Sequence, residues 1–482
     1  MPARKDWVVL KFGGTSVASV DRWQTIADAI EQRTADDERA MVVCSALSGV
    51  SNLLQKLINA IDAEGDTDAP LAEIRARHEH LAESMNLDAD DEIGEELAEL
   101  GRIVEGARLI GTVPDEVRAR LMAMGELMAT RLGAAWLRSR GISVAWRDAR
   151  SLLQAEAASA GAASSHHYLS ATCHYAPDER LINDLADLSE HAVLTQGFIA
   201  ADRHGDTVLL GRGGSDTSAA YLAGKLNARR LEIWTDVPGL FTANPRDRAD
   251  ARLLRAVTFD EAQVLAAMGA RVLHPRCIPP VRDNDIPLHM RCTHAPEMEG
   301  TIVSRAAAPA ESGVKAVVSR HHLYLMRIDC PGHWHQTGTL ADVTGVFAQH
   351  GIAIDLIANS ASSISLTIDP AASPLTEQDV AGLVANLESI GTANVSGEVG
   401  SVSLVGSNIA SVMNRLSPAL KPLEAQRIHL VSDAGPDDAL SFVLEPEDVD
   451  YLMNPLHDWL LAQPQPETIF GPSWRELKNR LN

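Results

Sequence analysis

The sequence is poor in cysteine, has no long apolar run and lacks the P-loop signature of many nucleotide-binding proteins. Its five cysteines are scattered and odd in number, without a C-x-x-C pair. Such a set argues against a zinc site and a disulfide framework, so we expect no metal held by the protein alone. No apolar run approaches a membrane span, and the opening MPARKDW has no signal-peptide core. We therefore expect a cytoplasmic protein with no membrane partner.

Positive charge is also scarce. The chain has 42 Lys and Arg against 65 Asp and Glu, for a formal net charge of −23. A field of this sign repels nucleic acid, so no nucleic-acid partner is expected. An anionic substrate would have to be gathered by a local cationic cluster, and we look for one where lysine or arginine stands beside glycine.

The first three hundred residues alternate β-rich runs with helical stretches, which predicts an open, mainly parallel α/β sheet between helices. The expected strands are 8–12, 41–45, 143–147, 192–199, 207–210, 230–235 and 288–292. Segments 192–199 and 207–210 are expected to form a hairpin, because AADRHGD between them is rich in turn formers. Residues 62–115 are acidic and helical and predict an exposed arm, followed by a long helix from 114 to 141.

The segment RAAAPAESG at 305–313 interrupts this pattern with small and helix-breaking residues. Beyond it, an order of helix, strand, turn and strand occurs twice, with 354–357 aligned to 428–431 and a further helix at 376–389 and 447–462. This repetition predicts two small βαββαβ modules. The expected organisation is a domain at 1–304, a linker at 305–314, a first module at 315–391, and a second module with a C-terminal segment at 392–482.

The stretch WVVLKFGGTS at 7–16 places Lys11 at the end of an apolar run, beside Gly13 and Gly14. A strand that ends in a simple glycine turn, with a solvated lysine, explains this pattern. A second interpretation is an anion site, in which the glycines bring backbone N–H groups close to phosphate oxygens and Lys11 supplies charge. The stretch alone leaves both open.

The segment VLLGRGGSDTSAAYLAGKLNA is more specific, because a strand, glycines, an arginine and a helix N-terminus meet at one point. Arg212, Gly213, Gly214, Ser215 and Asp216 together predict a site for an anion, with Arg212 suited to bidentate binding of a carboxylate. Asp216 also has a purely structural explanation as an acid that caps the helix.

Two further segments are candidates for binding. Glu126 is the only charge between Arg120 and Arg131, and a buried acid of this kind requires a cationic partner such as a substrate ammonium group. An exposed helical position is the alternative. Ser45 lies where the run VVCSALSG ends in small hydroxyl residues, as strand ends that line a site commonly do.

The segment LEIWTDVPGLFTANPR at 231–246 runs from a strand into Thr235, Asp236, a Pro-Gly turn, Phe241 and Arg246. Its strand end is a candidate to hold a nucleotide, with Phe241 near a base and Arg246 near phosphates. Arg271, in GARVLHP, is a further candidate phosphate contact.

The chain resembles the aspartokinase family in the identity and the order of six motifs. These motifs are KFGGTS at 11–16, GELM at 125–128, GRGGSD at 211–216, WTDVPG at 234–239, NPR at 244–246 and GARVLHP at 269–275. The resemblance implies an amino-acid-kinase fold followed by two ACT-like domains. It implies transfer of the γ-phosphoryl group of ATP, with Mg²⁺, to the side-chain carboxylate of L-aspartate, the first step towards lysine, threonine and methionine.

The same resemblance implies roles for individual residues. Lys11 and Asp216 would be catalytic. The aspartate site would comprise Ser45, Glu126, Arg212, Gly213, Gly214 and Ser215. The ATP site would comprise Lys11, Gly13, Gly14, Thr235, Asp236, Phe241, Arg246 and Arg271. The sequence departs from the family pattern at Phe241, Asn244 and Arg271, where Tyr, Asp and Lys are usual.

The resemblance also implies feedback regulation through the first ACT-like module. The effector would be lysine or threonine, bound by Gln336, Thr339, Leu340, Asp355 and Ser360. Asp355 would receive the effector's ammonium group, although the pattern of lysine-sensitive members is broken at His333, Gln336 and Ala361. A homodimer or higher homo-oligomer through residues 315–482 is expected, because exposed edge strands need cover.

Two alternatives remain from the sequence. The chain could be another amino acid kinase of the same fold, or an inactive amino-acid sensor that keeps the fold as a binding module. Retention of Lys11, Glu126, Arg212 and Asp216 together argues against the sensor. The sequence does not distinguish a complete chain from the kinase part of a longer fusion.

Overall fold

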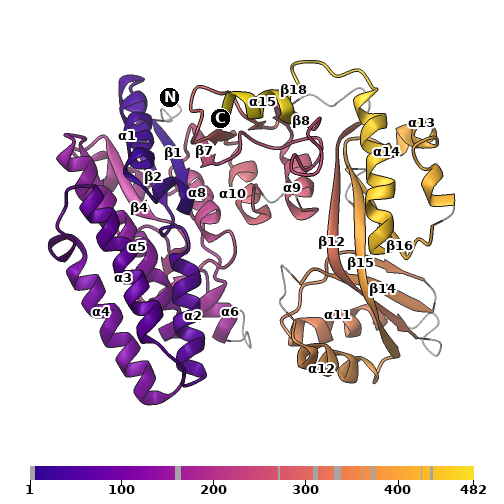
Figure 1. Ribbon diagram of the computed structural model, residues 1–482, viewed down its shortest axis with the longest axis horizontal. Coiled ribbons are helices and arrows are strands. Elements are labelled where there is room, and N and C mark those ends of the chain that lie inside the picture. Colours follow the sequence, from indigo (N-terminus) through magenta and orange to yellow (C-terminus); the bar gives the residue numbers. More distant parts are fainter. Residues whose placement is uncertain are drawn as a thin grey trace.

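The structure is a computed structural model. It describes residues 6–157, 164–269, 272–307, 313–330, 338–360, 362–370, 375–424, 426–434 and 438–481. Figure 1 shows an N-terminal α/β domain and a C-terminal α+β domain side by side, and the last residues of the chain return to the first domain. Two of the predicted residues, Arg271 and Gln336, lie outside the described residues.

The core of the first domain is an eight-stranded sheet in the order β3-β4-β2-β1-β7-β10-β11-β9. Its strands are β1 (Trp7–Phe12), β2 (Arg39–Cys44), β3 (Val144–Trp146), β4 (Ala192–Gln196), β7 (Arg230–Thr235), β9 (Ala256–Val257), β10 (Leu288–Cys292) and β11 (Ile302–Val303). Strands β3 to β10 in this order run parallel, and only the β10–β11 pair is antiparallel. The predicted open, mainly parallel sheet is confirmed.

The expected hairpin forms, but from a shorter segment than predicted. β5 (Ile199–Ala201) pairs antiparallel with β6 (Thr207–Leu209), whereas β4 lies in the parallel sheet between β3 and β2. The chain changes sheets at Gly197 and Phe198, where Phe198 has a φ of 71°. A continuous apolar run therefore contains two strands, and sequence alone does not mark the break.

Helices cover both faces of the sheet. Alternate residues of β1 point to opposite sides, so Val8, Leu10 and Phe12 join one core while Trp7 and Val9 join the other. The first core is covered by α1 (Val20–Ala35), α2 (Val50–Asp62), α3 (Asp68–Ser84), α4 (Ala89–Ile110) and α5 (Asp115–Ser139). The second is covered by α7 (Glu179–Ala186), α8 (Gly214–Lys225), α9 (Phe259–Ala267) and α10 (Ile278–Asp283). Shorter elements are α6 (Ser164–Leu169), η1 (Gly14–Val17), η2 (Ala149–Ser151) and η3 (Pro275–Cys277).

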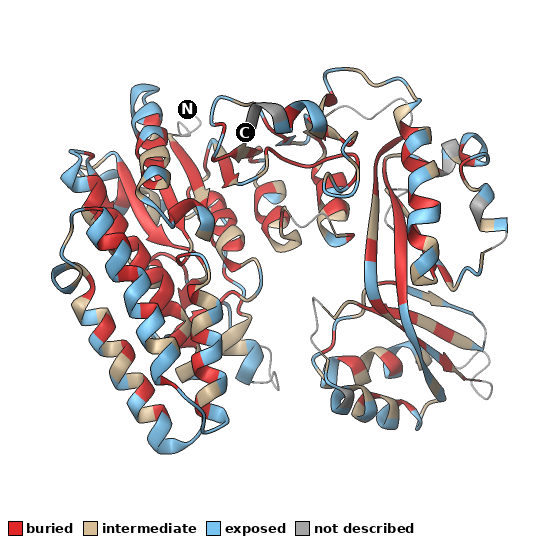
Figure 2. Cartoon of the chain, viewed as in Figure 1, coloured by how far each residue is buried: buried red, intermediate tan, exposed pale blue. Residues whose placement is uncertain are grey.

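The acidic segment 62–115 is not an exposed arm, as the sequence suggested. It forms α3 and α4, whose apolar residues Ile74, Leu81, Ile93 and Leu100 are buried against α2 and α5. Figure 2 shows the division, with the outer faces of these helices exposed and the inner faces buried. The acidic composition of this segment reflects its solvent face alone. None of the described helices combines the length and apolar character needed to cross a membrane.

The second domain is built on one antiparallel sheet in the order β13-β14-β12-β15-β17-β16. Its elements are β12 (Val314–Asp329), α11 (Thr339–Gln349), β13 (Ile357–Asn359), β14 (Ser363–Ile368), α12 (Glu377–Leu387), β15 (Thr392–Gly406), η4 (Ile409–Val412), α13 (Met413–Leu416), η5 (Lys421–Glu424), β16 (Leu430–Ala434), β17 (Ala439–Leu444), η6 (Pro446–Asp448) and α14 (Val449–Leu461). The two long strands β12 and β15 pass through both predicted modules (Figure 1). The half of β12 up to Arg320 lies opposite the part of β15 that pairs with β17, so each module is completed by a strand from the other.

The C-terminal segment packs against the first domain. β18 (Phe470–Ser473) pairs with β8 (Arg252–Leu254), and α15 (Trp474–Leu481) follows it. The Trp474 ring meets Phe241 edge to face at 5.6 Å between centroids. The contacts of this C-terminal segment join it to the first domain.

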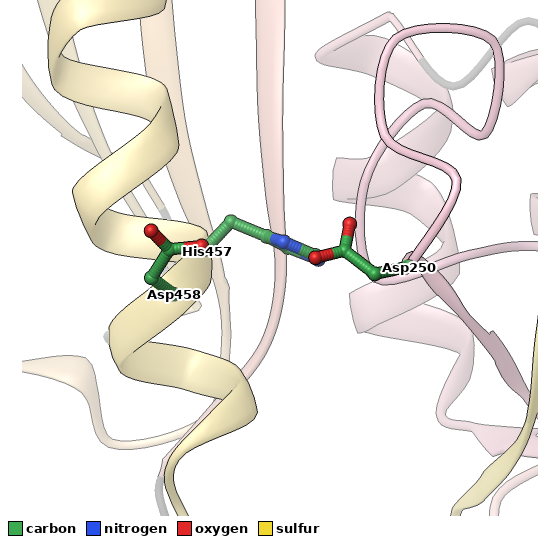
Figure 3. A group of neighbouring side chains, drawn as sticks. All are labelled: Asp250, His457 and Asp458. Atoms are coloured by element: carbon green, nitrogen blue, oxygen red, sulfur yellow. The ribbon is translucent and has the colours of Figure 1, made fainter.

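A charged cluster also links the two domains. Asp250 lies in the loop before β8, and His457 and Asp458 lie on α14 (Figure 3). One potential ligand atom from each of these residues lies within 4.8 Å of the others. Arg248 Nη2 is 2.7 Å from Asp250 Oδ2 and 2.6 Å from Asp458 Oδ1, so a guanidinium group already holds the position between the carboxylates. We interpret the cluster as an interdomain salt bridge.

A second interdomain contact is fully buried. Lys315, at the start of β12, places its Nζ 2.7 Å from Glu261 Oε2 on α9, and both side chains are 1% exposed. Glu261 also accepts from the Thr258 N–H at the start of its helix and from Ser407 Oγ at the end of β15. Three elements from two domains therefore share one carboxylate.

This ion pair gives a stability prediction. Lys315→Met leaves Glu261 buried without its cation, and we expect the free energy of unfolding in urea to fall by about 3–5 kcal/mol. Lys315→Met combined with Glu261→Gln should recover most of that loss, because Gln keeps the helix-start hydrogen bond without a charge. Arg305→Met, at an exposed pair with Asp285, is the control and should change stability by less than about 1 kcal/mol. Equal losses in the single and double variants would contradict the prediction.

Candidate active site

The candidate site lies along the carboxyl ends of the parallel strands. In the sheet register, Phe12 stands opposite Cys44 and Trp234, Cys44 opposite Gln196, and Thr235 opposite Cys292. The residues that follow these strands therefore share one edge of the sheet, as in other open α/β sheets that bind ligands there. This edge brings together Gly13, Gly14, Ser45, Thr235 and Asp236.

Lys11 and Asp216 meet at this edge. The helix α8 starts after Gly213, whose φ of 62° suits glycine, and Asp216 lies in its first turn. Lys11 Nζ is 2.6 Å from Asp216 Oδ1, and the two side chains are only 12% and 15% exposed. Lys11 is thus not a solvated charge at a strand end, and Asp216 does more than cap a helix. Both predicted catalytic residues lie at one point.

The glycines of both candidate loops permit close approach. A Cβ on Gly14 would lie 2.8 Å from the Ala46 carbonyl oxygen, so the loops after β1 and β2 touch through their backbones. Gly211 and Gly213 both have positive φ values, and the turn between them presents Arg212 to solvent. The α8 N-terminus is directly beside this arginine, and its Gly214 N–H donates to the Gly211 carbonyl at 3.0 Å to close the turn. The arrangement is suited to an anion.

Glu126 is buried, so the alternative of an exposed helical position is wrong. It lies on α5 with 3% exposure, and its Oε1 accepts the Ala46 N–H at 3.2 Å. The approach of α5 depends on Gly125, where a Cβ would lie 2.9 Å from that of Ala46. Glu126 Oε2 has no hydrogen-bond partner among the described residues. Burial raises the pKa of this carboxyl to about 8, partly opposed by the Ala46 N–H.

A polar network fixes the position of this part of α5. Thr130 Oγ1 accepts hydrogen bonds from Gln196 Nε2 at 2.8 Å and from Trp146 Nε1 at 3.1 Å, and it donates to the Glu126 carbonyl. Gln196 Oε1 in turn accepts the Ala149 N–H. The ends of β3 and β4 thereby orient the helix that carries Glu126.

The predicted nucleotide residues divide into two groups. Thr235 and Asp236 lie at the end of β7, where Thr235 Oγ1 donates to Asp236 Oδ1 and the Thr235 carbonyl accepts from Thr293. Arg246 is exposed in the loop after β7. Phe241 instead packs in the core shared with α14 and α15, with 8% exposure, so its position gives no support to stacking on a base.

The predicted effector residues surround the start of α11 and the strand β13. Thr339 and Leu340 begin α11, and Ser360 bonds back to Ser363. Asp355 is already paired: Arg320 binds it bidentately at 2.8 and 2.7 Å, and Thr367 Oγ1 donates to it at 3.0 Å. Arg320 also packs against Met268 and Gly269, after α9.

Three residues of these sites were missed by sequence reasoning, namely Phe198, His274 and Arg320. His274 and Phe198 pack against the GRGGSD loop. Arg320 forms an ion pair with Asp355, the residue expected to bind the effector's ammonium group. His274 belongs to the quoted GARVLHP motif, which was a usable signal. The positive φ of Phe198 and the partner of Arg320 depend on tertiary structure and had no sequence signal.

Comparison with known proteins agrees with this geometry. The model of the amino acid kinase family matches residues 6–292. The lysine-sensitive aspartokinase 3 of Escherichia coli is 32% identical over 93% of this chain and 98% of its own, and the chloroplastic aspartokinase 1 of Arabidopsis thaliana is 28% identical over 93% of this chain and 79% of its own. The chain therefore belongs to the amino acid kinase family.

Solved structures show to which group within the family this chain belongs. E. coli aspartokinase III in complex with aspartate and ADP, in the R state, matches with a TM-score of 0.78 and 31% identity, covering 94% of this chain and 99% of that one. The same enzyme with lysine and aspartate, in the T state, gives 0.72 and 30% over the same shares. Within its family, this chain is one of the aspartokinases, as its motifs suggested.

The buried carboxyl of Glu126 predicts a pH dependence of stability. Because its pKa in the folded protein is about 8, above the ordinary value of 4.5, the native state holds a proton that the unfolded chain releases. The resulting stabilisation is complete below about pH 4.5 and is lost as the pH rises through 8. We expect the ligand-free wild type to lose melting temperature relative to Glu126→Gln between pH 6 and 9.

The measurement is thermal unfolding across that range without ligands. Glu116→Gln, at an exposed position of the same helix, is the control and should follow the wild-type profile. Parallel profiles for wild type and Glu126→Gln would show that Glu126 is ionised in the free protein and would contradict the prediction.

Proposed function

We propose that this aspartate kinase transfers the γ-phosphoryl group of ATP to the side-chain carboxylate of L-aspartate through the residues at the carboxyl edge of its sheet. The product is 4-phospho-L-aspartate. The observation that supports these roles best is the buried carboxyl of Glu126, whose Oε2 has no hydrogen-bond partner among the described residues and whose Oε1 accepts from Ala46, the residue that the loop after β1 touches at Gly14.

The charged groups of aspartate would be recognised by residues of opposite charge. The ammonium group of aspartate would lie against Glu126 Oε2, which otherwise has no partner among the described residues, and would favour the ionised form of that acid. Arg212 and the N–H groups of Gly213 and Ser215 would bind carboxylate oxygens, with Gly214 between them in the same turn and Ser45 as a further contact. Pairing both ends of the amino acid selects its length.

The chemistry needs no general base. A substrate carboxylate is ionised at pH 7, and one of its oxygens attacks the γ-phosphorus while the bond to the bridging oxygen of ADP breaks. Lys11 would leave Asp216 partly and neutralise charge on the transferred group, and the backbone at Gly13 and Gly14 would admit the phosphates. Thr235, Asp236, Arg246 and Arg271 would surround the nucleotide.

Magnesium is expected to arrive with the nucleotide. Mg²⁺ retains several waters and is held by phosphate oxygens with one or two carboxylates, and this edge offers the carboxylates Asp216 and Asp236. This donor set fits such a shared ion. When bound, Mg²⁺ would neutralise charge on the phosphate oxygens.

The assignment of Lys11 gives a test. Lys11→Met should lower kcat by about 10²–10³-fold, the usual loss when one preorganised charge at a reacting centre is removed. Turnover is measured by trapping the acyl phosphate with hydroxylamine, with ATP, Mg²⁺ and a panel of acidic amino acids that includes glutamate. Wild-type turnover with another acid and not with aspartate would contradict the proposed substrate.

Two control variants separate chemistry from folding. Lys11→Met with Asp216→Asn should recover melting temperature, because no unpaired carboxylate remains, without recovery of turnover. Arg212→Ala should raise the KM for aspartate by more than tenfold and the KM for ATP far less. Near-normal kcat in Lys11→Met would contradict the catalytic assignment.

Regulation and assembly form the second part of the proposal. An effector amino acid, lysine or threonine, would bind the first ACT-like module through Gln336, Thr339, Leu340, Asp355 and Ser360. Its ammonium group would compete with Arg320 for Asp355. The chain would form at least a homodimer through residues 315–482, where apolar Ile357 and Val431 are exposed on the strands β13 and β16 at the two edges of the sheet.

Asp355→Asn tests the effector assignment. The amide keeps the shape of the carboxylate without its charge, so we expect inhibition by lysine, threonine or their mixture to weaken at least tenfold in half-inhibitory concentration. Basal kcat in the absence of effector is the internal control. A wild type that ignores all three conditions, or a variant that responds equally, would contradict this part of the proposal.

A further inference from the structure

The glycine turn before α8 is packed tightly on both sides by bulky side chains. A Cβ on Gly213 would collide with Cγ of His274, and a Cβ on Gly214 would lie 2.5 Å from Cδ2 of Phe198. The two rings therefore rest directly on the backbone of the turn. Because the turn carries the N–H groups at the start of α8, the rings fix where those groups point.

Phe198 has an unfavourable backbone conformation. Its φ of 71° places a bulky residue in the left-handed region, a conformation that the surrounding structure must impose. Its N–H donates to Ser218 Oγ on α8 at 2.8 Å, and its carbonyl accepts from the Leu210 N–H at 2.8 Å. The preceding Gly197 lies against Ser215, where a Cβ would be 2.6 Å from the serine Cβ. Phe198 is thus bound to both ends of the glycine loop.

His274 forms the other side. Its Nδ1 accepts the Arg276 N–H at the start of η3, so the proton of the neutral ring is on Nε2. The charged groups that act on the ring are Asp216, Arg276 and Arg212, and burial lowers its pKa below the ordinary value. Arg276 in turn donates to the carbonyl oxygens of Leu210 and Ala171. A neutral, anchored ring therefore covers Gly213.

We propose that Phe198 and His274 are positioning residues for phosphoryl transfer, which clamp the Gly213–Gly214 turn so that its N–H groups and Arg212 meet the substrate. This inference rests on the proposed function of the same site. Neither residue contacts the reacting atoms in this account. Loosening the clamp should lower kcat by misplacing the donors, since small displacements at a reacting centre have large effects.

The two roles of His274 can be separated by substitution. His274→Asn keeps a side-chain acceptor for the Arg276 N–H but removes the ring, whereas His274→Phe keeps a ring without the acceptor. If the ring positions the turn, kcat should fall at least tenfold in His274→Asn, which lacks the ring, and less in His274→Phe, which keeps a ring. If the acceptor stabilises the fold, the melting temperature should decrease more in His274→Phe, which lacks the acceptor.

Substitution of Phe198 should separate stability from turnover. Phe198→Gly adopts the positive φ without strain, so its melting temperature should equal or exceed that of Phe198→Leu, while kcat falls at least tenfold in both. The KM for ATP should stay within about twofold. Phe259→Leu, on the buried face of α9, is the matched control and should lose melting temperature with kcat nearly unchanged.

Wild-type turnover on aspartate is measured first, because its absence would contradict the proposed function itself. With an active wild type, unchanged kcat in His274→Asn and Phe198→Gly would overturn the clamp. Losses of kcat that parallel the loss of melting temperature across all variants would also overturn it, since they would show a structural role alone.

Discussion

The ion pair between Lys11 and Asp216 is the contact around which the catalytic edge is arranged. It joins the first strand of the chain to a helix two hundred residues later, and it requires that β1 end beside the N-terminus of α8. Both groups are largely shielded from water, so their attraction is stronger than at an exposed surface. Ser45, Thr235 and Asp236 lie at the same edge, because β2 and β7 run parallel to β1 and end beside it.

The regulatory domain meets the catalytic domain at both ends of one short helix. Lys315 binds Glu261 in the first turn of α9, and Arg320, five residues further along β12, packs on Gly269 after its last turn. His274 follows a few residues later and covers Gly213. Contacts therefore connect Asp355 through Arg320 to the end of α9, and a separate contact joins His274 to the glycine turn. Such contacts transmit a signal only if an effector favours one of two arrangements, and under the proposed function the exchange of Arg320 for an ammonium group at Asp355 would supply that difference.

The sequence predicted the elements whose causes are local. Continuous apolar, β-rich runs predicted the parallel strands, and the spacing of Leu121, Met128 and Trp136 predicted the long helix α5. Sequence predictions were wrong where tertiary contacts determine the local structure. The acidic stretch 62–115 packs as two helices because its sparse apolar residues share one face, and the run at 192–201 divides because Phe198 is forced into a positive φ. The contact between the C-terminal segment and Phe241 had no sequence signal for the same reason, since the fold brings Trp474 to Phe241.

A chain with a net charge of −23 binds anions here by local exchange of partners. Lys11 is held by Asp216, and Arg320 by Asp355, before any ligand arrives. A phosphate or an ammonium group that takes one member of such a pair frees the other, so the net electrostatic gain is smaller than the new contact alone. The affinity for the ligand then depends on whether both the ligand and the displaced side chain find new hydrogen-bond or ion-pair partners. Glu126 differs, because its Oε2 has no hydrogen-bond partner among the described residues, and under the proposed function an ammonium group bound there would distinguish an amino acid from a simple anion.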